Sequence, residues 1–181
     1  MVTDPRAVAR FTALYDEFYP RVHAYAVSRT GRQLAEEVAG ETFTIAWRRF
    51  ADLPDPPLPW LIGIARNISR ESYRAEARQA ALTAELRSWA AESAADVSES
   101  VVERAALLRA LATLTDDDRE VLTLVAWHGL TSAQAAAVLG CTKSAYFVRL
   151  HRARKRLEDA LIDQPDPARV KVLIPRTESD R

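Results

Sequence analysis

The chain has 181 residues, of which 48% are hydrophobic, 28% are charged and only 5 are glycines, a composition typical of a folded, soluble protein. Its 25 basic residues balance 25 acidic ones, so any binding of nucleic acid must come from basic residues that are segregated along the chain. The single cysteine excludes an intrachain disulfide and a zinc site built on cysteines. No apolar run approaches the roughly 20 residues that span a bilayer, and residues 1–6 contain no apolar signal core. We therefore expect a cytoplasmic protein with no membrane insertion.

The first part of the chain is predicted to form two helices. Apolar side chains recur at helical intervals from Phe11 to Tyr25, and Pro20 is expected to kink this helix or to begin a second one. Gly31 closes the element. The next helix is predicted over residues 33–50, with a broad apolar arc on one side. An ordered polar face with a tryptophan at its edge lies on the other side and is formed by Glu37, Glu41, Thr44, Trp47 and Arg48.

A stiff loop and a third helix follow. Four prolines between residues 52 and 59 remove hydrogen-bond donors and restrict the residues before them, which excludes a regular helix there. The third helix is predicted from Trp60 to about residue 78. Trp60 is either an anchor in the core or an aromatic group that contacts a ligand. The outward face of this helix is polar and cationic, with Arg66, Asn67, Arg70, Arg74 and Arg78.

The next segment differs in charge from its neighbours. Residues 80–103 hold five acidic side chains and one arginine with weak periodicity, which indicates a mobile linker whose ends can be helical. Helical patterns resume at residues 101–114. Thr115 is predicted to cap the following helix, which has three aspartates in its first turn and ends at Gly129. A strand-like pattern occurs only at residues 170–174, so the fold is predicted to be all-α.

The segment from Thr131 to Leu157 has the layout of a helix-turn-helix. Thr131 and Gln134 stand at the spacing of a capping box, Gly140 can end the first helix, and Thr142 can cap the second. Residues of the second helix recur at spacings of four, three and four and form one stripe that we expect to be buried. That stripe consists of Tyr146, Leu150, Ala153 and Leu157.

The remaining surface of this second helix is cationic. No acidic residue lies between Cys141 and Leu157, so the helix can neutralise several phosphates and release their counterions. A solvated surface helix is the alternative, but the caps, the turn glycine and the apolar stripe are all in register. The residues expected to face DNA are Lys143, Ser144, Phe147, Val148, Arg149, His151, Arg152 and Lys155.

The sequence holds no pattern that indicates catalysis. Three histidines are scattered on predicted helices without the spacing of metal ligands or of a nucleophile and its base. No glycine-rich phosphate loop occurs either. We therefore expect no enzymatic activity, no metal and no cofactor.

Several separate segments, in a fixed order, carry a family pattern. They are residues 35–43 with 46–49, residues 59–67, Leu114 with residues 119–122, and residues 150–157. Together they resemble the extracytoplasmic-function, or group IV, sigma factors of bacterial RNA polymerase, in the sigma-70 family, and the resemblance covers residues 11–162. It implies sigma region 2 at residues 1–79, an acidic linker at 80–103, sigma region 4 with the helix-turn-helix at 104–163, and a C-terminal tail of unknown role at 164–181.

The resemblance implies a sigma factor that binds core RNA polymerase and directs promoter-specific transcription initiation. The polar face that includes Glu37 and Trp47 would contact the clamp coiled coil of the polymerase. Minus-ten promoter DNA would be opened and read by Trp60, Arg66, Asn67, Arg70 and Arg74. The helix of residues 143–156 would read the minus-thirty-five element in the major groove, and the linker would thread the polymerase cleft. An anti-sigma factor is a further candidate partner.

The chain departs from the family at two places. The family commonly has glutamine where Gly40 stands, and Phe147 and Val148 replace its usual small and cationic groove-facing residues. Such apolar side chains can pack against thymine methyls, or they can belong to a protein contact that masks the helix. The alternative function is a stand-alone helix-turn-helix regulator that binds duplex DNA without polymerase. Such a regulator needs a sensor or dimer domain, which residues 34–78 do not resemble.

Overall fold

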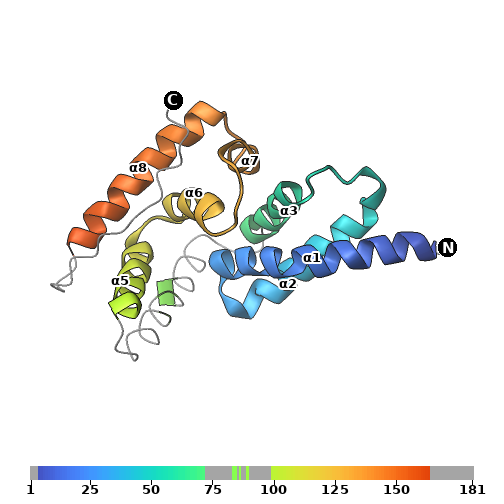
Figure 1. The fold of residues 1–181 in the computed structure, drawn as a ribbon, viewed down its shortest axis with the longest axis horizontal. Helices are drawn as coiled ribbons and strands as arrows, with labels where there is room; N and C mark the ends of the chain where they lie inside the picture. The colour runs from blue at the N-terminus through green and yellow to red at the C-terminus, as the bar shows by residue number, and fades with distance from the viewer. Residues whose placement is uncertain (1–3, 72–82, 85, 87–88, 90–98, 164–181) are drawn as a thin grey trace.

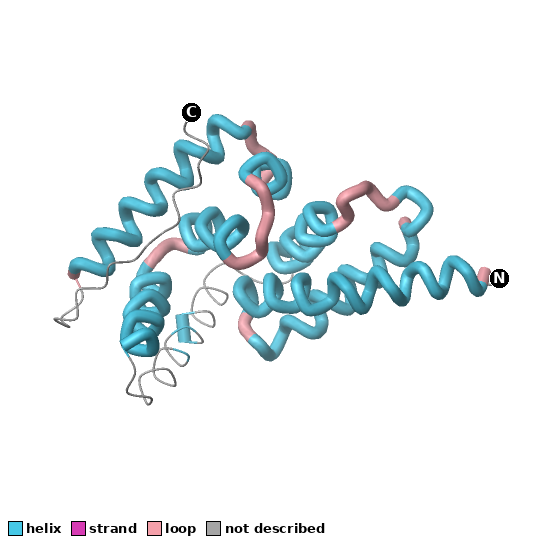
Figure 2. Tube along the Cα trace, viewed as in Figure 1, coloured by secondary structure: helices cyan, strands magenta, loops and turns pink. Residues whose placement is uncertain are grey.

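Every regular element in the part of the chain that the structure describes is a helix, as predicted (Figures 1 and 2). The computed structural model describes residues 4–71, 83, 84, 86, 89 and 99–163. Arg74, Arg78, most of the predicted linker and the tail with its strand-like pattern lie outside the described residues. The helices are α1 (Pro5–Thr30), α2 (Arg32–Arg48), a short 3-10 helix (Phe50–Asp52), α3 (Leu58–Glu71), α5 (Glu99–Thr113), α6 (Asp116–Ala126), α7 (Ser132–Val138) and α8 (Lys143–Ile162).

The first helix, α1, is continuous through Pro20, so no second helix begins there. Proline removes one backbone hydrogen bond from a helix interior. Packing offsets that loss, because Val22, Tyr25 and Ala26 in the next turns are fully buried. The helix ends as predicted at Gly31, whose φ of 76° lies in the left-handed region that favours glycine.

Helices α1, α2 and α3 pack together as the N-terminal bundle (Figure 1). The predicted apolar arc of α2 is buried, with Val38, Ala39 and Phe43 at most 3% exposed. Helix α3 begins at Leu58, two residues before the predicted start. Pro59 therefore lies in its first turn, where the missing N–H group would have no helical partner in any case.

Helices α5 to α8 form the C-terminal bundle, and its predicted caps are all present. The hydroxyls of Thr115 and Thr142 accept backbone hydrogen bonds at the starts of α6 and α8. Thr131 and Gln134 form both hydrogen bonds of the capping box at α7. Helix α5 begins at Glu99, inside the segment predicted as linker.

The two bundles lie against one another (Figure 1). Helix α3 of the N-terminal bundle contacts α7 of the C-terminal bundle, and α6 approaches the C-terminal half of α1. The contact between the bundles brings together residues that are far apart in the chain. Tyr25 and Glu120, for example, are 95 positions apart. It places residues of the predicted minus-ten helix beside the helix-turn-helix half of the chain.

Candidate nucleic-acid and partner interfaces

Helix α8 has the two faces that the sequence predicted. Tyr146, Leu150, Ala153 and Leu157 are buried, at most 4% exposed. The Tyr146 hydroxyl donates a hydrogen bond to the Val121 carbonyl at 3.0 Å and so ties α8 to α6. Burial raises the pKa of Tyr146 to about 12, so the hydroxyl stays protonated and keeps donating.

The predicted DNA-facing residues of α8 lie mostly on its exposed surface. Those exposed to solvent are Lys143, Ser144, Val148, Arg149, His151, Arg152 and Lys155. The cation of Arg156 is engaged within the bundle, because it pairs with Asp118 at 2.6 Å. The exposed residues together form a cationic strip along one helix, a shape that fits a major groove lined with phosphates.

The two apolar residues among those predicted to face DNA, Phe147 and Val148, differ in burial. Val148 is 51% exposed. Phe147 is half-buried and packs against the core, with its ring 6.2 Å from the Tyr146 ring and 5.8 Å from the Lys143 ammonium. Val148 therefore points outward as expected, whereas Phe147 does so only in part, because its ring lies along the surface of the bundle.

The predicted polar face of α2 is intact and faces solvent. Glu37, Glu41, Thr44 and Arg48 are exposed, and Trp47 is 36% exposed at the edge of the face. Trp47 packs edge-on against Phe11 of α1, with ring centroids 4.9 Å apart. The opposite side of α2 is committed to the core, so this face is free to contact another molecule.

The predicted minus-ten residues are not gathered on one surface. Asn67 and Arg70 are exposed on α3. Trp60 is half-buried, packs against the core and lies 5.7 Å below the Arg49 guanidinium. Arg66 instead points toward the other bundle, where its side chain is 12% exposed and its Nε donates to Glu120 Oε1 at 3.0 Å.

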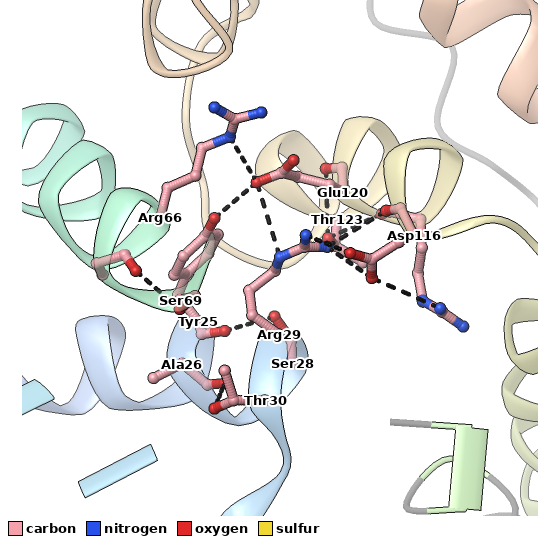
Figure 3. A network of polar contacts seen from close by, with 12 residues as sticks. Tyr25, Ala26, Ser28, Arg29, Thr30, Arg66, Ser69, Asp116, Glu120 and Thr123 are labelled. Carbon is pink, nitrogen blue, oxygen red and sulfur yellow. Dashed lines mark hydrogen bonds and ion pairs between the residues drawn. The ribbon is translucent and has the colours of Figure 1, made fainter. Parts of the chain in front are cut away.

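A buried polar cluster joins the two bundles, and the sequence reasoning missed it (Figure 3). Glu120 of α6 accepts a hydrogen bond from the Tyr25 hydroxyl at 2.6 Å and lies 3.8 Å from the Arg29 Nε. Arg29 Nη2 pairs with Asp116 at 2.6 Å. Together with Arg66, these residues form the inter-bundle cluster, defined as Tyr25, Arg29, Arg66, Asp116 and Glu120.

The charges of the inter-bundle cluster support one another. Burial by itself would raise the pKa of Glu120, but the nearby Arg29 and Arg66 and the Tyr25 hydrogen bond more than offset it and hold that pKa below its usual value. Burial would likewise lower the pKa of Arg29, yet Glu120 and Asp116 raise it. Both groups therefore stay charged although they are almost completely shielded from water.

His128 extends this contact in the loop after α6. Its carbonyl accepts a hydrogen bond from Arg21 Nη2 at 2.7 Å, and its ring packs edge-on against Tyr25 at 5.2 Å. Its Nε2 lies 3.4 Å from the Ser28 hydroxyl. Burial, with a smaller contribution from Arg21, lowers the pKa of His128 to about 4, so the ring is neutral at pH 7.

A sequence signal for the cluster exists in retrospect. Val22, Tyr25 and Arg29 follow one another at spacings of three and four, so the arginine continues the apolar stripe of α1. Glu120 likewise lies on the buried side of α6, four residues before the buried Leu124. A charged residue on a stripe that must be buried indicates a buried partner of opposite charge, although it does not identify that partner.

Two kinds of site do not occur among the described residues. No helix in those ranges is long and apolar enough to cross a membrane. Within the same ranges, no group of three or more histidine, cysteine, aspartate or glutamate side chains is arranged to hold a metal ion. The charged and aromatic surfaces of α2, α3 and α8 are candidate sites because of their exposed polar and cationic side chains.

Comparison with known proteins identifies the two halves. The family model for Sigma-70 region 2 matches residues 14–79, and that for Sigma-70, region 4 matches residues 104–157. RfaY of Xanthomonas campestris pv. campestris, described as a probable RNA polymerase sigma factor, is 37% identical over 73% of this chain. The chain spans 35% of the length of RfaY.

A relative of similar size and a solved structure agree with these matches. The ECF RNA polymerase sigma factor SigL of Mycobacterium tuberculosis is 30% identical over 82% of this chain and 87% of its own length. The sigma factor RpoE of Bartonella quintana, solved in complex with the anti-sigma factor NepR, has the same fold, with a TM-score of 0.63 at 24% identity over 86% of this chain and 99% of RpoE. The chain therefore belongs to the extracytoplasmic-function sigma factors of the sigma-70 family.

Proposed function

We propose that this chain binds core RNA polymerase and directs promoter-specific transcription initiation, without enzymatic activity of its own, in the cytoplasm. The observation that carries the proposal is the pairing of two exposed surfaces on separate bundles. The α8 strip, which includes Arg149 and Arg152, is suited to phosphates and base edges. The α2 face, which includes Glu37 and Glu41, is polar and acidic and suits a protein partner.

The α3 surface supplies the part of the proposal that concerns promoter opening. Single-stranded DNA is held by cationic side chains along its backbone and by aromatic rings that stack on its bases. Asn67 and Arg70 are exposed in a position to contact such a strand, and Trp60 lies earlier on the same helix. Arg66 would join them once its contact with Glu120 is broken. An anti-sigma factor is a further proposed partner, on the strength of family membership.

The stand-alone regulator is the weaker alternative. It would explain the helix-turn-helix but would leave the exposed α2 face without a role. The match of residues 14–79 to region 2 also argues against it.

Binding to core polymerase separates these two functions. Purified chain and core enzyme are mixed, passed over a size-exclusion column and then tested for retention of promoter DNA. We expect the chain to co-elute with core enzyme and the complex to shift duplex promoter fragments that neither component shifts alone. A chain that binds the duplex fully by itself and never co-elutes with polymerase would favour the stand-alone regulator.

Gly40 offers a test of the α2 face. It is exposed in the helix interior, and an added Cβ would meet no atom within 4 Å. Gly40→Ala and Gly40→Gln should each stabilise the chain by up to ~1 kcal/mol, because glycine is a poor helix former. Only the glutamine variant should also bind core polymerase more tightly, since it adds a polar group to the proposed contact. Equal polymerase affinities for the two variants in a titration would count against the contact.

Val148 offers a test of the α8 strip. If its side chain packs against a thymine methyl, Val148→Ser should reduce the preference for thymine at one position of the minus-thirty-five element by roughly 1 kcal/mol, or about fivefold. Competition between base-substituted duplexes for the polymerase complex measures this preference. The matched control is Val8→Ser, because Val8 is an exposed valine, 41% exposed, near the start of α1. An unchanged base preference for Val148→Ser would show that this valine does not read DNA.

A further inference from the structure

We propose that the inter-bundle cluster is an autoinhibitory lock. In this lock Glu120 binds the Arg66 side chain, which would otherwise contact promoter DNA. The inference rests on the proposed function, because it assigns Arg66 to the minus-ten strand. In the closed chain, a carboxylate of the C-terminal bundle takes the place of a DNA phosphate. Polymerase and promoter would then have to separate the bundles before α3 can bind the strand.

The geometry of Arg66 supports direct competition. Its Nε hydrogen bonds to Glu120 Oε1 at 3.0 Å, and the Glu120 side chain is 1% exposed. Asn67 and Arg70, on the same helix, are exposed. A guanidinium binds carboxylates and phosphates through the same N–H groups. Arg66 therefore cannot donate the same N–H group to a DNA phosphate while it bonds to Glu120.

The lock also has a second attachment on α1. Arg29 forms its 2.6 Å ion pair with Asp116 and lies near Glu120, and Tyr25 donates to Glu120 at 2.6 Å (Figure 3). Glu120 thus receives contacts from both α1 and α3. All of these contacts join one bundle to the other, so each is lost when the bundles separate.

The chemistry of the cluster favours a contact that can open. Charges that are buried must give up their hydration, and their mutual attraction repays this only while the geometry is good. Separation of the bundles returns the charges to water, whereas an apolar interface would have no such compensation. Polar contacts between domains are typical of domains that move relative to one another. Removal of one partner should therefore shift the chain toward the open state.

The first test measures the distance between the bundles and does not depend on polymerase. The native Cys141 and an introduced Ala51→Cys, on an exposed residue, supply two sites for dyes. Single-molecule energy transfer should show one closed population in the otherwise unchanged chain. Glu120→Gln should add an open population, and Asp117→Asn, an exposed change of equal charge on α6, should not. A Glu120→Gln chain that stays fully closed would overturn the lock.

A milder variant guards against simple loss of folding. Asp116 has a side chain that is 27% exposed, so Asp116→Asn breaks the ion pair with Arg29 at the rim of the cluster. It should retain the full helical circular dichroism signal and show a smaller open population than Glu120→Gln. A closed distribution for this folded variant, together with a Glu120→Gln chain that does not fold, would contradict the proposal.

The second test measures competition for Arg66 with a labelled single-stranded DNA of mixed sequence at low salt. Glu120→Gln should bind it about five- to tenfold more tightly than the unchanged chain, as expected for a released cationic contact. The gain should disappear in the Glu120→Gln, Arg66→Gln double variant, and Asp117→Asn should show little gain. A gain that persists without Arg66 would refute the competition. The energy-transfer test does not use polymerase. A failure of the lock can therefore be distinguished from a failure of the chain to bind polymerase.

Discussion

Reversal of charge on the α2 face should weaken the complex with core RNA polymerase by at least about thirtyfold, or roughly 2 kcal/mol. The variant is Glu37→Arg, Glu41→Arg, which replaces two exposed acids of the face with cations. Like charges brought together in an interface cost up to several kcal/mol, whereas exposed positions contribute little to folding. A titration of core enzyme with labelled chain measures the dissociation constant.

The matched control makes the same change of net charge elsewhere. Glu158→Arg, Asp159→Arg replaces two exposed acids near the end of α8. We expect this control to bind core polymerase with nearly unchanged affinity, and both variants to have the melting temperature of the unchanged chain. An α2 variant that folds normally and binds core as tightly as the control would remove the basis for this surface assignment.

A fall from pH 7 to pH 5 should destabilise the folded, closed chain by about 2 kcal/mol through His128. Contact with α1 buries this ring and lowers its pKa from the ordinary 6.5 to about 4. The closed chain therefore favours the neutral ring. The stability that the neutral ring contributes is fully present above pH 6.5 and is lost as the pH falls toward 4. The groups that face it are Arg21, Tyr25, Ser28 and Arg29 of α1 and Glu120 of α6.

Glu120 acts in a different pH range. Its pKa is held below the ordinary carboxyl value, so it stays ionised between pH 7 and pH 5 and contributes little to the slope there. Thermal unfolding followed by circular dichroism at closely spaced pH values measures the effect. His128→Gln should flatten the dependence between pH 7 and 5, and His151→Gln, on the exposed face of α8, should leave it unchanged. If the stability of His128→Gln fell as steeply between pH 7 and 5 as that of the unchanged chain, groups other than His128 would be responsible for the fall.

Local signals explain why the helices could be predicted from the sequence. The hydroxyls of Thr115, Thr131 and Thr142 stand where a helix start needs an acceptor, and each is a cap in the structure. Gly31 and Gly140 stand where a left-handed residue is needed. The buried stripe of α8 follows from its spacing alone. These features depend on neighbours within a few residues, which a single sequence displays.

The features that escaped prediction depend on distant contacts. At Pro20 the sequence allows either a kink or the start of a new helix, and only the new helix is wrong, because α1 runs from Pro5 to Thr30 and is packed around the fully buried Tyr25. The sequence predicts Arg66 on the outward face of the third helix together with Asn67 and Arg70, and no local pattern shows that Glu120 lies beside it. The inter-bundle cluster arises from how the two bundles meet, and helical periodicity carries no information about that. The proposed contacts with polymerase and promoter remain predictions.

Run-off transcription tests the central claim most directly. Core RNA polymerase is incubated with fragments of the source genome, with and without the chain, and the transcripts are mapped to their start sites. The proposed function predicts discrete transcripts that appear only with the chain, each preceded by shared minus-ten and minus-thirty-five elements. Initiation that is equally weak and unspecific with and without a folded chain that binds core polymerase would contradict it.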